Sequence, residues 1–67
     1  MGVAKISEIS SSSKTSFEDA VDQGIRRFSK TVENVEGAWI KEQKVVVSKG
    51  VIKEYRVTMK VTFTLND

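Results

Sequence analysis

The side chains that could bind a ligand lie in the second half of the sequence, around its only tryptophan. Trp39 stands in a stretch rich in charged and amide side chains, where an exposed indole would offer a stacking platform for a flat aromatic ligand. Gln43 and Arg56 carry amide and guanidinium groups that could bond the polar edge of such a ligand. The alternative is that Trp39 anchors a contact between subunits, because tryptophan is favoured there.

The remaining residue types argue against catalysis. The sequence contains neither histidine nor cysteine, which removes the commonest general base, every Ser-His or Cys-His nucleophile pair, and the usual zinc and haem ligands. We therefore expect no enzyme, no catalytic residue and no metal site, with acid–base chemistry by lysine or glutamate as a third alternative. The acids Glu18, Asp19 and Asp22 have a simpler explanation, because a helix N-terminus favours negative charge.

Charged residues of both signs are interspersed along the chain. Eleven basic and nine acidic residues give a net charge of +2, whereas nucleic-acid-binding proteins gather lysine and arginine on one face. No stretch approaches the roughly 18 apolar residues of a membrane span, and no signal-peptide pattern opens the chain. We expect a soluble cytoplasmic protein with neither a nucleic-acid nor a membrane partner.

The first half of the sequence predicts a strand, a polar loop and a helix. Residues 3–9 alternate loosely, and the serine run Ser10–Ser13 is expected to form a loop, because serines bond their own backbone. Two overlapping capping boxes, one starting at Thr15 and one at Ser16, mark the start of the helix. An apolar stripe at helical spacing then extends over about four turns, and Asn34 or Gly37 is expected to end it. The stripe comprises Phe17, Ala20, Val21, Ile25, Phe28 and Val32.

From residue 38 onward the hydrophobic pattern repeats every two residues, which predicts a β-hairpin. The alternation is strictest in residues 54–65, and residues 38–47 are the expected partner strand. A two-residue turn at Lys49-Gly50 would pair Ile40 with Met59. This register sets apolar residues opposite apolar residues.

The same register decides where the tryptophan lies. It places Trp39 on the polar face of the hairpin, with Gln43 and Arg56 on that face as well. A register shifted by one residue would instead bury Trp39 in the core, because such a shift moves every side chain to the other face.

These elements combine into one α+β domain over residues 1–67. The order β-α-β-β allows a three-stranded antiparallel sheet with the last strand in the centre and one amphipathic helix on one face. A strand of some 14 residues is about 45 Å long, whereas a helix of about 17 residues covers only about 25 Å. The hairpin end would remain exposed, and the chain is too short to bury a large core. We therefore expect self-association.

Four segments, in order and across nearly the whole chain, resemble the dodecin family. They are S-K-T-S-F-E-D-A-V at 13–21, S-K-T-V-E-N-V at 29–35, E-Q-K-V-V-V at 42–47 and G-V-I-K-E-Y-R-V-T-M-K-V-T-F-T-L at 50–65. The resemblance implies a β-α-β-β protomer that assembles into a hollow homododecamer. It also implies flavin binding without catalytic turnover, with paired flavin rings stacked between tryptophans of neighbouring copies and a glutamine bonding the ring edge.

The sequence departs from the family at both of these contacts. Gly37 stands where the family has its flavin tryptophan, and Arg56 stands where it has the glutamine. Trp39 follows two residues after Gly37 and should project from the same face, displaced by about 6.6 Å. It could act as a substitute wall, or the displacement could abolish stacking, which prefers ring centroids about 4.5–7 Å apart. Arg56 can donate hydrogen bonds to a flavin or a phosphate but cannot accept them.

The resemblance implies a flavin-binding and storage protein whose partners are copies of itself and a small aromatic ligand. The flavin would be flavin mononucleotide (FMN), riboflavin or a lumichrome-type ring, and the expected contact positions are Trp39, Arg56, Gly37 and Gln43. The alternative is a dodecin-fold oligomer that has lost flavin and serves as a structural assembly or binds ions or another small ligand.

Overall fold

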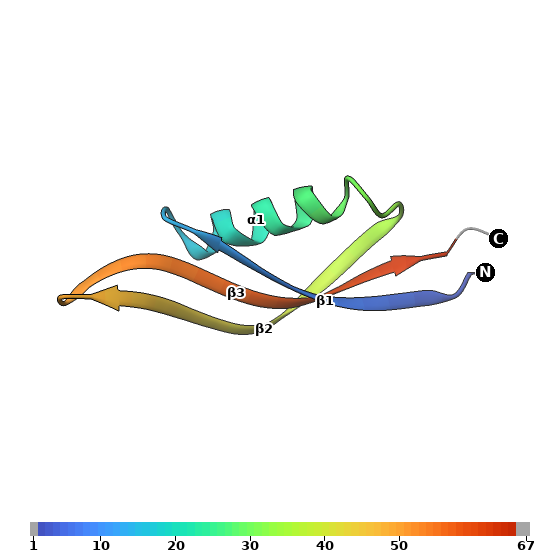
Figure 1. Ribbon diagram of the computed structural model, residues 1–67. Helices are drawn as coiled ribbons and strands as arrows, with labels where there is room; N and C mark the ends of the chain where they lie inside the picture. The colour runs from blue at the N-terminus through green and yellow to red at the C-terminus, as the bar shows by residue number, and fades with distance from the viewer. Residues whose placement is uncertain (1, 66–67) are drawn as a thin grey trace.

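The fold is a three-stranded antiparallel sheet with one helix packed on one face (Figure 1). The computed structural model describes residues 2–65. The elements follow the order β1 (Ala4–Ser13), α1 (Phe17–Phe28), β2 (Val35–Ser48) and β3 (Val51–Thr64). The sheet order is β1-β3-β2, so the last strand is central. The predicted β-α-β-β architecture is confirmed.

The serine run at the end of β1 is strand, and the prediction of a loop there is wrong. The central strand is long enough to supply partners, so that Ser10 lies opposite Thr58 and Ser12 opposite Arg56. Ser13 is buried, donates from its hydroxyl to Asp19 Oδ2 at 2.6 Å, and accepts from the Thr15 amide at 2.9 Å. Pairing with β3 therefore outweighs the local preference of serine for loops.

The helix begins where the capping box at Ser16 predicted. The Ser16 hydroxyl accepts a hydrogen bond from the Asp19 amide at 3.0 Å, which satisfies one of the free amides of the first turn.

The helix ends at Phe28, earlier than predicted, because the backbone after this residue winds into a tighter turn. The amides of Lys30 and Thr31 donate to carbonyls three residues earlier, at 3.2 and 3.1 Å, a geometry typical of a closing helical turn. Asn34, at φ 61°, then leads the chain into β2.

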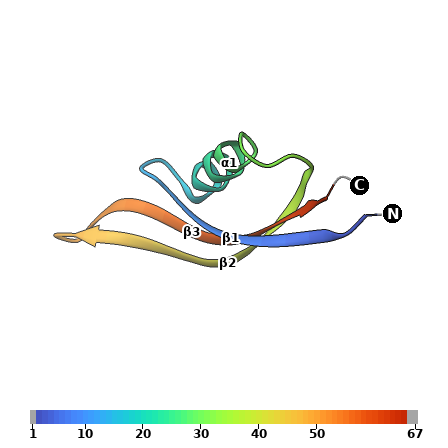
Figure 2. The same ribbon diagram turned by 45° about the vertical axis from the view of Figure 1, so that its right-hand side comes forward.

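The core lies between α1 and the centre of β3. Ala20, Val57 and Met59 have at most 1% of their surface exposed. Gly24 lets the helix approach closely, since a Cβ atom there would stand 2.6 Å from the Met59 methyl carbon. The helix therefore covers one face of the sheet, whereas the other face is bare (Figure 2).

The hairpin turn adopts the predicted two-residue form. Lys49 and Gly50 have φ values of 53° and 76°, as a type I′ turn requires. Ile40 pairs with Met59, as predicted, but three irregularities interrupt the ladder between β2 and β3. One lies between Ile40 and Glu42, so Lys41 is an extra residue on β2. Such a bulge shifts the register of the residues that follow it.

The shifted register changes the partner of Gln43. Gln43 lies opposite Val57, whose side chain is buried under the helix, and Lys44 takes the place opposite Arg56. The prediction that Gln43 shares a face with Trp39 and Arg56 is therefore wrong. The physical reason is the bulge at Lys41, which reverses the side-chain alternation once along β2.

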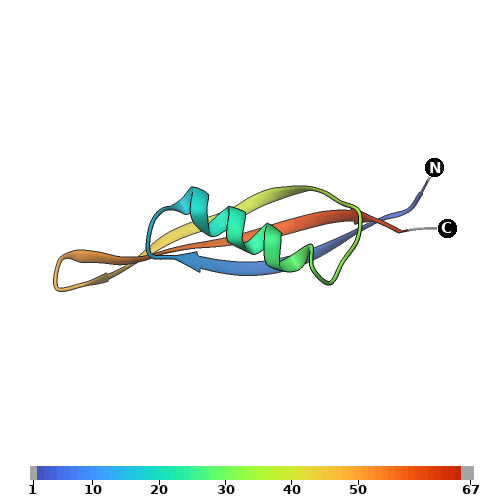
Figure 3. The ribbon, with the colours of Figure 1, turned by 90° about the horizontal axis from the view of Figure 1, so that it is seen from above.

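The end of the hairpin extends beyond the helix (Figure 3). The protein measures 51 Å along its longest axis, whereas a helix of 12 residues is about 18 Å long. Four apolar side chains near the hairpin turn are 36–55% exposed: Val45, Val47, Val51 and Ile52. The predicted mismatch between the sheet and its helical cover is confirmed.

Candidate functional site

The face of the sheet opposite the helix carries the candidate binding residues. Trp39 lies opposite Lys60 and Gly37 opposite Thr62. Lys60 and Thr62 alternate along β3 with the buried Val61, so this pair of positions points away from the core. The expected placement of Trp39 on the polar face, on the same side as Gly37, is confirmed, and 61% of the indole residue is exposed.

Gly37 leaves room for a side chain. A Cβ atom there would meet only the Thr62 hydroxyl oxygen, at 3.5 Å, which is an ordinary van der Waals contact. Its backbone is outside the positive-φ region that restricts other residues. This position therefore needs glycine neither for close packing nor for its backbone conformation.

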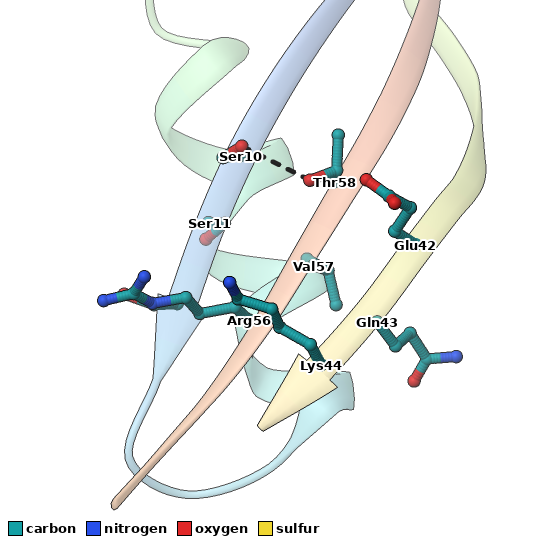
Figure 4. Close-up of a pocket in the computed structure, with 9 residues that line it drawn as sticks. Ser10, Ser11, Glu42, Gln43, Lys44, Arg56, Val57 and Thr58 are labelled. Atoms are coloured by element: carbon teal, nitrogen blue, oxygen red, sulfur yellow. Dashed lines mark hydrogen bonds between the residues drawn. The ribbon is translucent and has the colours of Figure 1, made fainter. Parts of the chain in front are cut away.

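A second feature of this face is an open groove between β1 and β2 that runs over β3. Its volume is about 520 Å³, within the usual range for small-molecule sites. In Figure 4 the side chains of Lys44 and Arg56 both extend toward β1, whereas that of Gln43 points away from them. The lining residues are Ser10, Ser11, Ser12, Glu42, Gln43, Lys44, Arg56, Val57 and Thr58.

One end of the groove is positively charged. Lys44 and Arg56 lie directly opposite each other on neighbouring strands, a like-charge arrangement that is unfavourable by itself. The Arg56 Nε atom donates to Glu54 Oε1 at 2.8 Å. Among residues 2–65, Lys44 has no acidic side chain within ion-pair distance. The groove therefore offers the donors of a lysine and the remaining donors of an arginine.

Trp39 and the basic end of the groove are separated along the sheet. Their partners on β3 are four residues apart, which corresponds to about 13 Å. Between them, Lys41 Nζ contacts Glu8 Oε2 on β1 at 3.3 Å. Trp39 and Arg56 of one chain therefore cannot both contact the same aromatic ring. A ligand stacked on Trp39 would need its other contacts from another copy of the chain.

Sequence reasoning missed Lys44, and the bulge explains why. A signal was present in the spacing of the apolar residues on β2. Ile40 and Val45 are five residues apart, yet both lie opposite residues on the helix side of β3. An odd spacing between residues of one face requires one extra residue in the strand.

The acidic residues near the helix start are occupied within the fold. Asp19 accepts hydrogen bonds from Ser13 and Gln23, and Asp22 forms an ion pair with Arg26 at 2.7 Å. Within residues 2–65 no group of three or more potential metal ligands occurs. In the same part of the chain, no helix is long and apolar enough to cross a membrane.

Comparison with known proteins identifies one family. The Dodecin family model matches residues 3–66. Dodecin from Streptomyces davaonensis is 29% identical, with 98% of this chain and 97% of that chain covered and a TM-score of 0.94. A variant of Thermus thermophilus dodecin is 27% identical over the full length of both chains, with a TM-score of 0.94. No individually curated protein matches the sequence significantly.

A third similar structure belongs to a protein that is named for the ion it binds. It is a calcium-chelating antigen from Mycobacterium tuberculosis, called calcium dodecin and described as having a novel calcium-binding site. It is 31% identical, with 96% of this chain and 91% of that chain covered and a TM-score of 0.83. Calcium binding is thus named for one protein of this fold.

Proposed function

Since this chain belongs to the dodecin family, we propose that it is a non-enzymatic protein that binds and stores a flavin within a homododecamer. The family and the fold support a small-molecule binding protein of the dodecin type, and dodecins form oligomers. Storage in the cytoplasm, the number of copies and the flavin itself are the further parts of the proposal.

The observation that carries the proposal is the exposed indole of Trp39 beside the open position of Gly37. An indole residue with 61% of its surface exposed is unfavourable in an isolated chain, because it leaves a large apolar area in water. Stacking on a flat aromatic ring would cover that area. Trp39 lies on the same face as Gly37, so we propose it as a substitute wall, displaced by about 6.6 Å.

Self-association would supply the cover for exposed apolar surface and the second tryptophan that one chain lacks. The apolar hairpin end around Val47 and Val51 is exposed, and both outer strands have an open edge. Packing against other copies would cover this surface and bring a second Trp39 into reach of the first. A ring held between two such residues is shielded from water and from redox partners, and its release follows mass action.

The other proposed contacts have different roles. Arg56 would donate hydrogen bonds to an acceptor on the flavin, in place of the amide that the family resemblance implies. Gly37 would provide space beside the ring. Gln43 lies on the opposite side of the sheet from Trp39, so its proposed contact would be made with a flavin on a neighbouring copy.

The test is a fluorescence titration of purified protein with riboflavin. Stacking against an indole quenches flavin emission, so the proposal expects saturable quenching and a yellow preparation. Trp39→Leu serves as the variant that keeps an apolar side chain without the ring. Unquenched riboflavin at all protein concentrations would reject flavin storage.

A second candidate function follows from Gly37 and Arg56, which stand at the family's tryptophan and glutamine positions. These replacements favour a dodecin-fold assembly that has lost flavin and holds another small ligand or an ion. The calcium dodecin is a precedent for ion binding in this fold, although residues 2–65 of this chain contain no carboxylate cluster. A colourless particle that does not bind added riboflavin would favour this candidate.

A further inference from the structure

We propose that the Trp39 site selects planar aromatic ligands whose ring carries a negative charge, and that Lys60 is the residue that determines this selectivity. The inference deepens the proposed function and rests on it in one respect, namely that Trp39 stacks on the ligand. The selectivity itself stands on the charges around the indole, on the face of the sheet opposite the helix.

The indole of Trp39 has no aromatic partner in the described part of the chain. Both aromatic contacts there involve a ring of α1, Phe17 in one case and Phe28 in the other. Trp39 lies on the opposite face of the sheet and is 61% exposed. A ligand ring can therefore stack on the indole without displacing another side chain ring.

Lys60 is the cation that the register places beside this indole. It lies directly opposite Trp39 on the central strand β3, and its side chain points away from the core. Gly37 pairs with Thr62, the next residue on this face of β3. A ring stacked on Trp39 above Gly37 would therefore lie diagonally across from Lys60. Long side chains reach such diagonal neighbours on paired strands, so the ammonium group can contact the edge of the stacked ring.

The charge of Lys60 is not neutralised within residues 2–65. None of the three ion pairs there involves this residue. Glu8 lies opposite Lys60 on β1, but its carboxylate contacts Lys41 Nζ, at 3.3 Å from Oε2 and 3.4 Å from Oε1. Glu42, another acid on this face, lies one pair further along the sheet, opposite Thr58. Two lysines therefore share one carboxylate, and the immediate surroundings of the indole carry a net positive charge.

A net positive charge beside a stacked ring favours the anionic form of that ring. An opposite charge within about 4–6 Å stabilises an ionised group and lowers its pKa by about one unit or more. A ring that stays neutral lacks this gain. Since one pKa unit corresponds to a tenfold change in an equilibrium constant, we expect an anionic ring to bind about tenfold more tightly than its neutral form.

The experiment uses 8-hydroxyriboflavin, a riboflavin analogue whose ring hydroxyl ionises with a change of colour. Absorbance as a function of pH gives the midpoint of this ionisation for the free ligand and for the ligand bound to the assembled protein. The parent protein should lower the midpoint by about one pH unit, and Lys60→Gln should return it toward the free value. Lys60→Arg should keep the low midpoint because it preserves the charge. Glu8→Gln should lower the midpoint further because it removes a nearby negative charge.

Lys5→Gln is the matched control. Lys5 lies on β1 opposite Phe63, whose ring packs against Phe28 of α1, so this variant loses the same charge from the other face of the sheet. Arg56, the proposed donor to the flavin, is kept in every variant, and its contribution is therefore common to all titrations. Light scattering verifies that each variant keeps the particle size of the parent. An equal change of the midpoint in Lys5→Gln and Lys60→Gln would attribute the effect to overall charge and overturn the assignment.

The remaining outcomes separate ring selectivity from flavin storage. If riboflavin binds but 8-hydroxyriboflavin does not, or binds with a midpoint that Lys60→Gln leaves unchanged, the selectivity is overturned and flavin storage stands. If no flavin binds, the proposed function fails. The selectivity is then decided with 2-naphthoate and its neutral amide, followed through the emission of Trp39, the only tryptophan in the sequence. Stronger quenching by 2-naphthoate that is lost in Lys60→Gln would support the inference, and equal or absent quenching would reject it.

Discussion

Replacing Gly37 by tryptophan should increase flavin affinity. The position lies on the same face as Trp39 and is two residues away from it along β2. A new Cβ atom would meet only the Thr62 hydroxyl oxygen, at 3.5 Å, so a side chain can begin at this position without displacement of the backbone. Glycine is also a poor strand residue, and Gly37→Trp should therefore leave the stability of the strand unchanged or raise it.

The size of the effect follows from ring stacking. A well-placed aromatic pair contributes about 0.5–1.5 kcal/mol beyond the area it buries. Since about 1.4 kcal/mol corresponds to a tenfold change in affinity, the dissociation constant for riboflavin should fall about 2-fold to 10-fold. If the two tryptophans crowd each other, the double variant Gly37→Trp, Trp39→Ala should bind more tightly than Gly37→Trp alone.

Riboflavin fluorescence titration of the parent, Gly37→Trp, the double variant and Gly37→Leu measures this effect. Gly37→Leu is the matched control, because it fills the same space without an aromatic face. Affinity in Gly37→Trp and in the double variant no greater than in Gly37→Leu would refute the reasoning that this face of β2 forms the flavin wall.

Three further predictions concern the tryptophan, the core and the hairpin end. Trp39→Ala should weaken riboflavin binding in fluorescence titration while light scattering reports an intact particle; unchanged affinity would exclude Trp39 as a wall. Gly24→Ala should lower the free energy of unfolding by about 1 kcal/mol, because overpacking against Met59 exceeds the gain in helix propensity, and chemical denaturation that shows a rise would contradict the packing described for α1. Val51→Lys should dissociate the particle by placing a charge in the apolar hairpin end, and a particle of unchanged mass would show that this end is not buried between copies.

The topology could be predicted from the sequence because its strongest patterns are local. Strict alternation in β3, the Lys49-Gly50 turn and the capping box at Ser16 each specify an element without reference to the rest of the chain. Together they predicted the order of the elements, the central position of β3 and the pairing of Ile40 with Met59. They also predicted correctly that Trp39 faces away from the core.

Features that depend on tertiary partners could not be predicted in the same way. The serine run Ser10–Ser13 has the composition of a loop, and only the length of β3 makes it strand. The helix ends at Phe28, although the apolar stripe continues to Val32, which is half-buried in the connection to β2. A stripe of apolar residues reports burial, not helix length.

The candidate site was predicted in part, for a related reason. Trp39 and Arg56 lie on the predicted face, but Gln43 does not, and Lys44 was missed. One extra residue at Lys41 accounts for both differences, since a bulge exchanges the faces of all following residues until the next irregularity. A binding site on paired strands can therefore be predicted correctly only where the register of the strands is predicted correctly.

The central claim is that copies of this chain bury one another's exposed apolar surface and hold a flavin between them. Native mass spectrometry of the freshly purified protein tests it most directly, because one spectrum reports the number of copies and any small molecule that they retain. We expect a homododecamer that carries the added mass of flavin, either as isolated or after incubation with FMN. A monomer, or a particle that retains no flavin under either condition, would contradict the account.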